Sequence, residues 1–452
     1  MRHTAPRRLI ASTLLVAGLI ALSLISAASV SAAPIPGQYI VVLKDGVTER
    51  ATAADHARKG ADVFQHYRHV LNGYAARLSG SQLAAVRADG RVQYVAPDEE
   101  VASACDRVPG SPDVPQQLPC SVDRIDGESS STRSGDGTGS VNVNVAVLDT
   151  GIDLEHPDLN VVGGTNCSTG DGFDDQNGHG THVAGTIAAE DNGFGVAGVS
   201  PGARLWAVRV LTKNGGGTTS RIICGIDFVT GTRTDADPGN DIAVANMSLG
   251  GKGADDGNCG RTNKDPLHAA ICRSVQAGVV YATAAGNAST DLASDIPSAY
   301  DEVLAVTALS DFDGQPGALA SSHAFCTFDD NVGEADEAPA IFSNFATLAS
   351  DQAHTVAAPG VCVNSTFRLE EFPYAYLNGT SMAAPHVAGT LALCVASRRC
   401  AGLAPQQIIQ KIVADAAAYN TAKRNSGYGF QGDPLRPITG KYYGYLIRAG
   451  SY

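Results

Sequence analysis

The sequence has no dense run of lysine or arginine. Asp and Glu number 46 against 32 Lys and Arg, which gives a formal charge of −14 over 452 residues. A protein with this acidic balance and no basic patch is poorly suited to a phosphate backbone. We therefore expect no nucleic-acid partner.

The sequence also lacks any Cys-x-x-Cys pair, which argues against a zinc site of the cysteine type. All ten cysteines lie beyond residue 104. An even number of cysteines in an exported chain predicts disulfide bonds. The spacing leaves the connectivity open, although Cys394 with Cys400 and Cys259 with Cys272 would close short loops.

Long apolar runs are absent except at the N-terminus. Arg2, Arg7 and Arg8 precede the apolar residues 9–30, and small residues follow in SAAPIPG. This order is typical of a secretory signal peptide, so we assign residues 1–33 to one and expect a secreted, extracellular protein. The run is also long enough for an uncleaved membrane anchor. Once the signal is removed, we expect no membrane association.

Residues 34–104 predict a small domain of their own. YIVVLK (39–44) and RVQYVAPD (91–98) have the pattern of strands, and residues 51–60 and 81–90 have that of helices. Two further strands are expected on either side of Asn72-Gly73, a hairpin dipeptide. The order strand-helix-strand-strand-helix-strand is that of a ferredoxin-like α+β fold. A proline-rich connector at 105–120 follows it.

Residues 105–452 predict a larger α/β domain. Apolar strands are expected at 141–151, 203–211, 241–250, 277–287 and 302–309, with helices at 179–190, 218–231 and 265–278 between them. Apolar strands alternating with helices indicate a parallel sheet sandwiched by helices. In such sheets, sites form at the carboxyl ends of strands, where Asp149, Ser248 and Asn287 are placed.

Three stretches carry groups suited to acyl transfer. Asp149 ends a strand in VAVLDTG, while His179 and Ser381 stand at glycine-flanked helix starts in NGHGTHVAGT and NGTSMAAPH. A serine hydroxyl becomes a nucleophile when a histidine takes its proton, and a carboxylate orients that histidine. Pro385 has no N–H to bond the Ser381 carbonyl, so we expect a helix that is complete only beyond the serine. Ser381 would then lie at a helix N-terminus, which favours a developing oxyanion.

Together DTGID, HGTHVAGT, MSLGG, AAGN and GTSMAAPHVAG resemble the five signature segments of the subtilisin-like serine proteases (peptidase S8), in that family's order. The resemblance covers about residues 120–425, and residues 34–104 resemble the family's I9-type inhibitor propeptide. It implies a secreted serine endopeptidase made as a zymogen, acting on polypeptides through an acyl-enzyme without a catalytic cofactor. The propeptide would serve as an intramolecular inhibitor and folding aid, and the mature enzyme would be a monomer.

The resemblance also assigns roles to individual residues. Asp149 would orient His179, His179 would be general base and acid, Ser381 the nucleophile, and Asn287 the side-chain donor to the oxyanion. An extended substrate would be held between two segments, Gly215, Gly216 and Gly217 on one side and Ser248, Leu249 and Gly250 on the other. Asp295 would fall near the floor of the pocket for the residue before the cut. A carboxylate there would favour Lys or Arg, whereas self-cleavage after DEEVASA would not require a basic residue.

A structural calcium ion is the cofactor that the resemblance implies. Asp158, Asn192 and the carbonyls of Glu190, Phe194 and Val196 would supply hard oxygen ligands, although a loop of this composition can also be satisfied internally. At a second calcium site of the family, Thr355 replaces the aspartate, so we expect no ion there.

Several alternatives remain open. His179 and His182 could be metal ligands on one helix face, although no Glu follows as in His-Glu-x-x-His. Ser381 stands in Gly-Thr-Ser-Met-Ala, which departs from the Gly-x-Ser-x-Gly of lipases, and the histidine motif argues against the Ser-Glu-Asp peptidases. An inactive binding or scaffold protein would keep the fold without the chemistry.

Residues 310–341 and the tail beyond 429 are expected to be surface structure. Cleavage between Val101 and Cys105 would leave all ten cysteines in the product, and cleavage after Cys105 nine.

Overall fold

The structure of the protein is a computed structural model that describes residues 34–102, 107–109, 115–320 and 334–452. The expected signal segment, residues 1–33, lies outside these ranges. No helix in the described part of the chain is long and apolar enough to cross a membrane.

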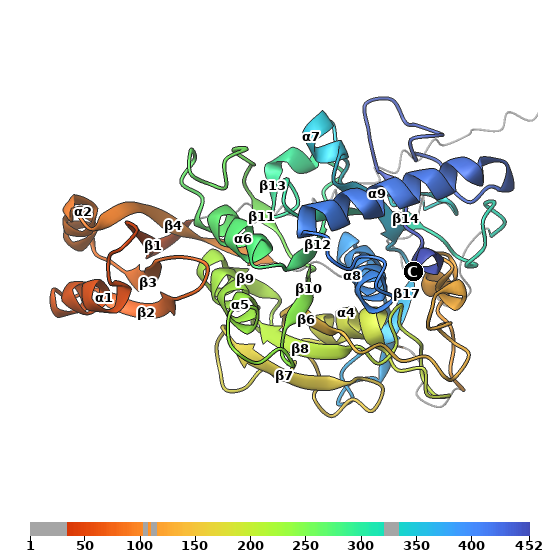
Figure 1. Ribbon diagram of the computed structural model, residues 1–452, viewed down its shortest axis with the longest axis horizontal. Coiled ribbons are helices and arrows are strands. Elements are labelled where there is room, and N and C mark those ends of the chain that lie inside the picture. Colours follow the sequence, from red (N-terminus) through yellow and green to blue (C-terminus); the bar gives the residue numbers. More distant parts are fainter. Residues whose placement is uncertain (1–33, 103–106, 110–114, 321–333) are drawn as a thin grey trace, which may run out of the picture.

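The N-terminal domain has the expected order of elements and lies at one end of the molecule (Figure 1). Its antiparallel sheet runs β2 (Asp62–Tyr67), β3 (Gly73–Arg77), β1 (Pro34–Leu43), β4 (Val92–Ala102), and α1 (Glu49–Arg58) and α2 (Gly80–Ala88) pack on it. The hairpin differs from the expectation, because residues 68–72 form a five-residue connection instead of a tight turn at Asn72-Gly73. Here the amides of Arg68, His69 and Val70 all donate to the Asp227 carboxylate of the large domain.

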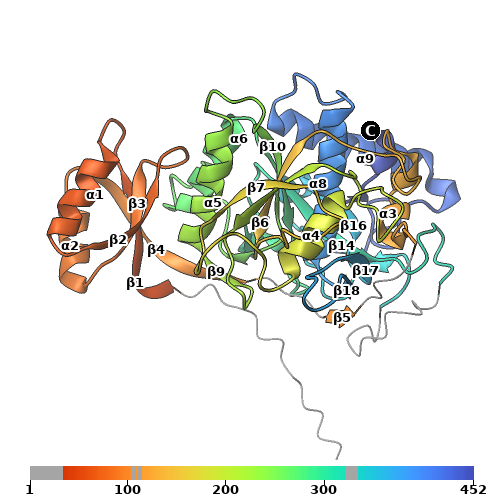
Figure 2. The same cartoon turned by 90° about the horizontal axis from the view of Figure 1, so that it is seen from below.

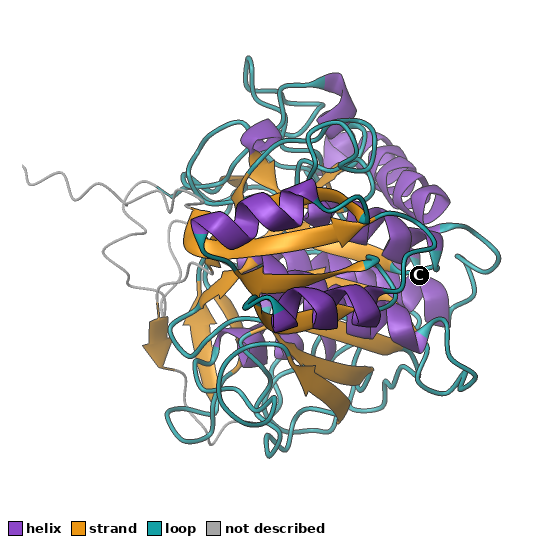
Figure 3. Ribbon diagram, turned by 90° about the vertical axis from the view of Figure 1, so that its left-hand side faces the viewer, coloured by secondary structure: helices purple, strands orange, loops and turns teal. Residues whose placement is uncertain are grey.

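The large domain, which lies behind the N-terminal domain in Figure 3, is built on a mostly parallel sheet. In sheet order its strands are β19 (Tyr445–Leu446), β16 (Thr355–Pro359), β14 (Leu304–Ser310), β12 (Val280–Ala284), β10 (Ile242–Met247), β6 (Asn144–Asp149), β8 (Arg204–Arg209) and β7 (Val161–Asn166). β15 (Ala338–Pro339) pairs antiparallel with β14. All five strands expected in this domain are present, with helices on both faces of the sheet, so the sequence-based fold class is confirmed.

Two apolar layers cover the sheet. Along β6, Val145 and Val147 face one layer while Ala146 and Leu148 face the other, because successive side chains of a strand point to opposite sides. The first layer contains α4 (His179–Ala188), α8 (Thr380–Ala396) and α9 (Pro405–Ala422), and the second contains α5 (Thr219–Thr232) and α6 (Pro266–Gln276). Residues of β1 and β2 pack into the second layer, so this core continues into the small domain (Figure 2).

The tail and the acidic insertion are more than surface structure, which corrects the expectation for both. Leu446 of the tail is fully buried, and β19 extends the central sheet beside β16. In the insertion, Glu337 receives two hydrogen bonds from the buried Arg124 guanidinium, at 2.5 and 2.6 Å. Residues 321–333 of the insertion lie outside the described ranges.

The remaining α-helices and strands of the described chain are short. They are α3 (Cys120–Asp123), β9 (Gly216–Thr218), β11 (Gly251–Lys252), β13 (Asp295–Ile296), α7 (Ala349–Gln352), and a sheet of β17 (Val363–Thr366), β18 (Tyr374–Leu377) and β5 (Arg107–Pro109). Disulfides join Cys259 to Cys272 and Cys394 to Cys400, as their spacing suggested, and Cys167 to Cys224.

Candidate active site

Asp149 and His179 meet at the carboxyl end of β6. Asp149 is the last residue of that strand, and His179 is the first residue of α4. The Asp149 Oδ1 atom lies 2.7 Å from His179 Nδ1, and both side chains are buried. A carboxylate in this position fixes the imidazole with its proton on Nδ1, so Nε2 is left as the basic nitrogen.

Gly180 makes this contact sterically feasible. A Cβ atom at residue 180 would lie 2.1 Å from the Gly151 carbonyl oxygen and 3.1 Å from Asp149 Cβ. The glycine of HGTH therefore lets α4 begin directly against the end of β6.

Ser381 lies in the first turn of α8, which begins at Thr380. Its carbonyl cannot receive the usual helical bond, because residue 385 is proline. The Ser248 hydroxyl donates to this carbonyl instead, at 2.6 Å, and the Ser381 hydroxyl donates to the Ser248 carbonyl, at 3.2 Å. Asn246 donates in turn to the Ser248 hydroxyl, at 2.9 Å. The proline and this pair of bonds hold Ser381 at the end of β10.

Asn287 is oriented by the residue preceding the serine. Its Oδ1 atom accepts from the Thr380 amide at 2.9 Å and from the Thr380 hydroxyl at 2.7 Å. Because the amide oxygen is committed to Thr380, the NH₂ group is the part of the side chain left to donate. Thr380 was not singled out from the sequence, although its position next to Ser381 was a clue.

The expected substrate segments flank the end of the N-terminal domain. β4 pairs antiparallel with β9 through Glu100 with Thr218, Val101 with Gly217 and Ala102 with Gly216. β11, which follows Ser248, Leu249 and Gly250, also lies beside β4. Residues 100–102 of the chain thus pair with β9, which includes Gly216 and Gly217. Gly215 directly precedes β9.

Asp295 is already paired. Lys252 Nζ lies 2.9 and 3.1 Å from its two carboxylate oxygens, and Asn344 donates to Oδ2 at 3.2 Å. Burial raises the pKa of Asp295, and the Lys252 ammonium opposes this rise. Sequence reasoning missed Lys252, which lies 43 residues away and has no motif of its own.

The histidine pair in HGTH does not form a metal site. His182 Nε2 lies 3.0 Å from the Val363 carbonyl and 3.1 Å from that of Ala375. Burial lowers the pKa of His182 to about 3, so the ring is neutral and carries its proton toward these carbonyls. His182 therefore belongs to the packing of α4 against β17 and β18.

The expected calcium loop surrounds a buried carboxylate. Asp158 is fully buried and accepts from Asn192 Nδ2 at 3.1 Å, Val196 N at 3.1 Å and the Tyr374 hydroxyl at 3.2 Å. Burial raises the pKa of Asp158 to about 7, and the hydrogen bonds from the three neutral donors offset this rise only in part. A buried carboxylate with neutral partners fits a cation, and the loop of Glu190, Phe194 and Val196 passes beside it. Gln116, which donates to Asp191 and accepts from Gly193, is a further oxygen source that the sequence reasoning missed.

These features fit a serine protease of α/β fold with a leading inhibitor domain. Family models match on both parts: the subtilase family (Peptidase_S8) over residues 140–430 and the peptidase inhibitor I9 family over residues 38–104. The chain belongs to the subtilase family and is a serine endopeptidase of that family.

Known relatives agree with this assignment. The chain is 35% identical to subtilisin E of Bacillus subtilis (strain 168) over 364 residues, which cover 79% of each chain. It is 39% identical to subtilisin DY of Bacillus licheniformis over 56% of this chain and 76% of that protein. It is 34% identical to the thermostable alkaline protease of Halalkalibacterium halodurans over 70% of this chain and 71% of that protein.

Proposed function

We propose that the protein is a secreted zymogen whose mature form cleaves peptide bonds through an acyl-enzyme on Ser381. The observation that carries this proposal is the buried 2.7 Å hydrogen bond between His179 and Asp149. It gives His179 the tautomer and orientation that a general base beside a serine requires.

The proposed reaction gives each of these residues one role. His179 Nε2 takes the proton of Ser381 Oγ as this oxygen attacks the substrate carbonyl. Asn287 Nδ2 and the N-terminus of α8 donate to the oxyanion that forms. His179 then passes the proton to the leaving amine, and the acyl group stays on Ser381. A water molecule, deprotonated by the same imidazole, releases the acid and restores the serine.

The N-terminal domain is the propeptide in this proposal. Its last strand lies along β9 as a substrate strand would, and cleavage before Cys105 would convert that strand into a product held in the groove. Backbone pairing of this kind gives affinity with little dependence on side chains. The ion pair of Asp295 with Lys252 supports cleavage after non-basic residues, because the carboxylate charge is already neutralised.

The calcium ion that the family implies would be held by Asp158 with Asn192, Gln116 and the carbonyls of the 190–196 loop. It would supply a compensating charge to a buried carboxylate and hold residues 115–117 against this loop, which they already contact by backbone bonds.

A serine-reactive fluorophosphonate probe tests the catalytic proposal. The mature wild-type protein should be labelled, and Ser381→Ala should not. Ser397→Ala, which removes a hydroxyl at the other end of α8, should be labelled like the wild type. N-terminal sequencing of the secreted product should show a start at or before Cys105. Absence of labelling of the mature wild type would favour an inactive scaffold.

A further inference from the structure

A second histidine, remote from Ser381 in the sequence, is surrounded by carboxylates. His268 of α6 is fully buried, and its ring stacks on Tyr300 with centroids 4.1 Å apart and planes 4° from parallel. Its Nε2 atom lies 2.8 Å from Glu302 Oε2. This contact places the proton of a neutral ring on Nε2, so the lone pair lies on Nδ1.

The Nδ1 atom faces two further carboxylates. It lies 3.3 Å from Asp255 Oδ1 and 3.4 Å from Asp256 Oδ1, and within the described chain it has no hydrogen-bond partner. Three acceptor atoms, the buried Nδ1 and the two Oδ1 atoms, therefore face one another. Such an arrangement is unfavourable unless a cation lies between them.

The separations match those of ligands around a small metal ion. Zinc lies about 2.0–2.2 Å from nitrogen and oxygen ligands, so two ligands at tetrahedral angles are roughly 3.3–3.5 Å apart. A carboxylate behind a ligating histidine, as Glu302 is here, orients the ring and raises its basicity. We propose that Asp255, Asp256 and His268 bind a divalent transition cation of the zinc class, because an imidazole nitrogen suits such an ion better than calcium.

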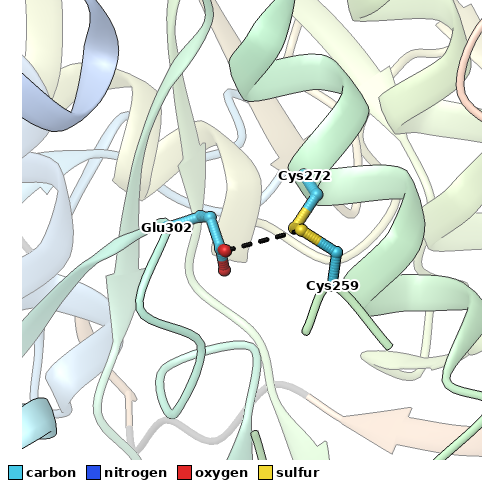
Figure 4. Close-up of side chains that lie close together, drawn as sticks. All are labelled: Cys259, Cys272 and Glu302. Carbon is cyan, nitrogen blue, oxygen red and sulfur yellow. Dashed lines mark hydrogen bonds between the residues drawn. A yellow bond between two sulfur atoms is a disulfide. The ribbon is translucent and has the colours of Figure 1, made fainter. Parts of the chain in front are cut away.

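The surrounding structure fixes the ligands in place. The disulfide between Cys259 and Cys272 ties the loop that carries Asp255 and Asp256 to α6, and Glu302 lies beside it (Figure 4). The two sulfur atoms are bonded to each other, so they are not thiolate ligands. Asp256 is held by four backbone amides, those of Asn258, Gly260, Thr262 and Asn263. Two of these amides use the Asp256 Oδ1 atom, whereas one amide, that of Gly257, donates to Asp255 Oδ1 at 2.9 Å, so we expect Asp255 and His268 to be the principal ligands and water to complete the shell.

The site has a structural consequence for the substrate groove. Asp255 follows β11 by three residues, and β11 carries Lys252, the partner of Asp295. An ion at this position would anchor the wall of the groove to α6. Cation binding at this position would not depend on the catalytic roles proposed above.

A proton is the competing cation. Burial disfavours the imidazolium, but the Glu302 hydrogen bond and the charges of Glu302 and Asp255 outweigh it and raise the pKa of His268. An imidazolium and a metal ion are distinguished by direct binding, which requires no enzymatic activity.

The experiment uses the full chain with Ser381→Ala and His179→Ala, which prevents self-cleavage and removes the active-site imidazole as a zinc ligand. After chelator treatment and dialysis, Zn²⁺ is titrated by calorimetry in excess Ca²⁺, and bound zinc is counted by mass spectrometry. We expect one Zn²⁺ per chain. Adding His268→Gln should abolish binding, Asp255→Asn should weaken it at least tenfold, and Glu302→Gln should weaken it by roughly 10–100-fold.

A matched control lies in the neighbouring group of Asp301, Asp351 and His354. His354→Gln should leave zinc binding unchanged. Loss of binding in His354→Gln together with normal binding in Asp255→Asn would move the ion to that group and overturn the proposal. Absence of bound zinc in the parent protein would also overturn it and leave the proton as the cation. If His268→Gln does not fold, the partly exposed Asp255 decides the outcome.

Discussion

At the scale of single residues, Pro385 explains the reciprocal bonds between Ser381 and Ser248. A proline four residues after the serine leaves the Ser381 carbonyl without a helical donor inside a buried helix. The Ser248 hydroxyl donates a hydrogen bond to this carbonyl instead, at 2.6 Å. A feature that weakens the helix thereby ties the serine to the end of β10, where the Ser248–Gly250 segment begins.

We therefore expect Ser248→Ala to destabilise the protein by about 1–3 kcal/mol, because it leaves a buried carbonyl unsatisfied. The free energy of unfolding lost through Ser248→Ala should be roughly 1 kcal/mol smaller when Pro385→Ala is also present, since residue 385 would then donate its own N–H to the Ser381 carbonyl. Urea unfolding of the four variants in the inactive Ser381→Ala background measures this coupling. Additive effects of the two substitutions would contradict the explanation.

The pairing of Lys252 with Asp295 leads to a prediction on specificity. With the ammonium removed by Lys252→Gln, the negative charge of the Asp295 carboxylate is no longer compensated within the protein and should attract a basic residue before the cut. We expect kcat/KM for an Arg substrate to rise about fivefold relative to a matched Phe substrate, which corresponds to ~1 kcal/mol for a partly exposed pair. Lys411→Gln, which breaks an ion pair on α9, is the control and should leave the ratio unchanged.

At the scale of elements, periodicity and motifs predicted five buried strands of the large domain and the helices between them, but they missed β7, β16, β19 and α9. β7 contains Gly163 and Gly164, which sequence reasoning treats as loop residues. The Trp206 ring covers Gly163 so closely that a Cβ there would lie 2.6 Å from it. β19 has two residues and is a strand only because β16 lies beside it. Asp149 and His179 could be predicted because their motifs are local, whereas Lys252 and Asp295 are joined only by the fold.

The helix α5 carries much of the contact with the N-terminal domain. Asp227, on the side of this helix, accepts the amides of Arg68, His69 and Val70, and Asp98 accepts from the Ser220 amide and hydroxyl at its start. Hydrogen bonds to a charged acceptor contribute about 1.5–3 kcal/mol each. The two aspartates thus bind one domain to the other through main-chain groups and a hydroxyl.

For Asp227→Ala, we expect at least tenfold faster release of the cleaved propeptide, because three amides lose their charged acceptor. The delay between propeptide cleavage and full peptidase activity should shorten accordingly, as followed by gel electrophoresis and a peptide assay. Asp241→Asn, which alters an ion pair with Arg233, should keep the wild-type delay. An unchanged delay in Asp227→Ala would show that the other contacts suffice.

At the scale of the whole molecule, several of the many acidic side chains are buried in the interior. Burial raises the pKa of Asp158, of Asp311 and, to about 6, of Asp351. Asp311 lies 3.2 Å from the buried Arg124, while Asp158 has neutral partners only. A buried carboxylate with neutral partners only, such as Asp158, lowers the stability of the folded state once it ionises, unless a cation binds beside it.

Asp158 therefore makes stability depend on pH and calcium together. Its folded pKa, about 7, lies above the ordinary value of 3.8. The folded state then binds the extra proton between pH 4 and 7, so the free energy of unfolding falls as pH rises through this range. Calcium binds the ionised form, so we expect it to raise Tm little at pH 5 and by about 5 °C or more at pH 8 with excess ion. Scanning calorimetry of the Ser381→Ala protein with calcium or chelator measures both trends. Asp158→Asn keeps the shape without the charge, so it should lose the calcium effect and most of this pH dependence; retention of both would place the ion elsewhere.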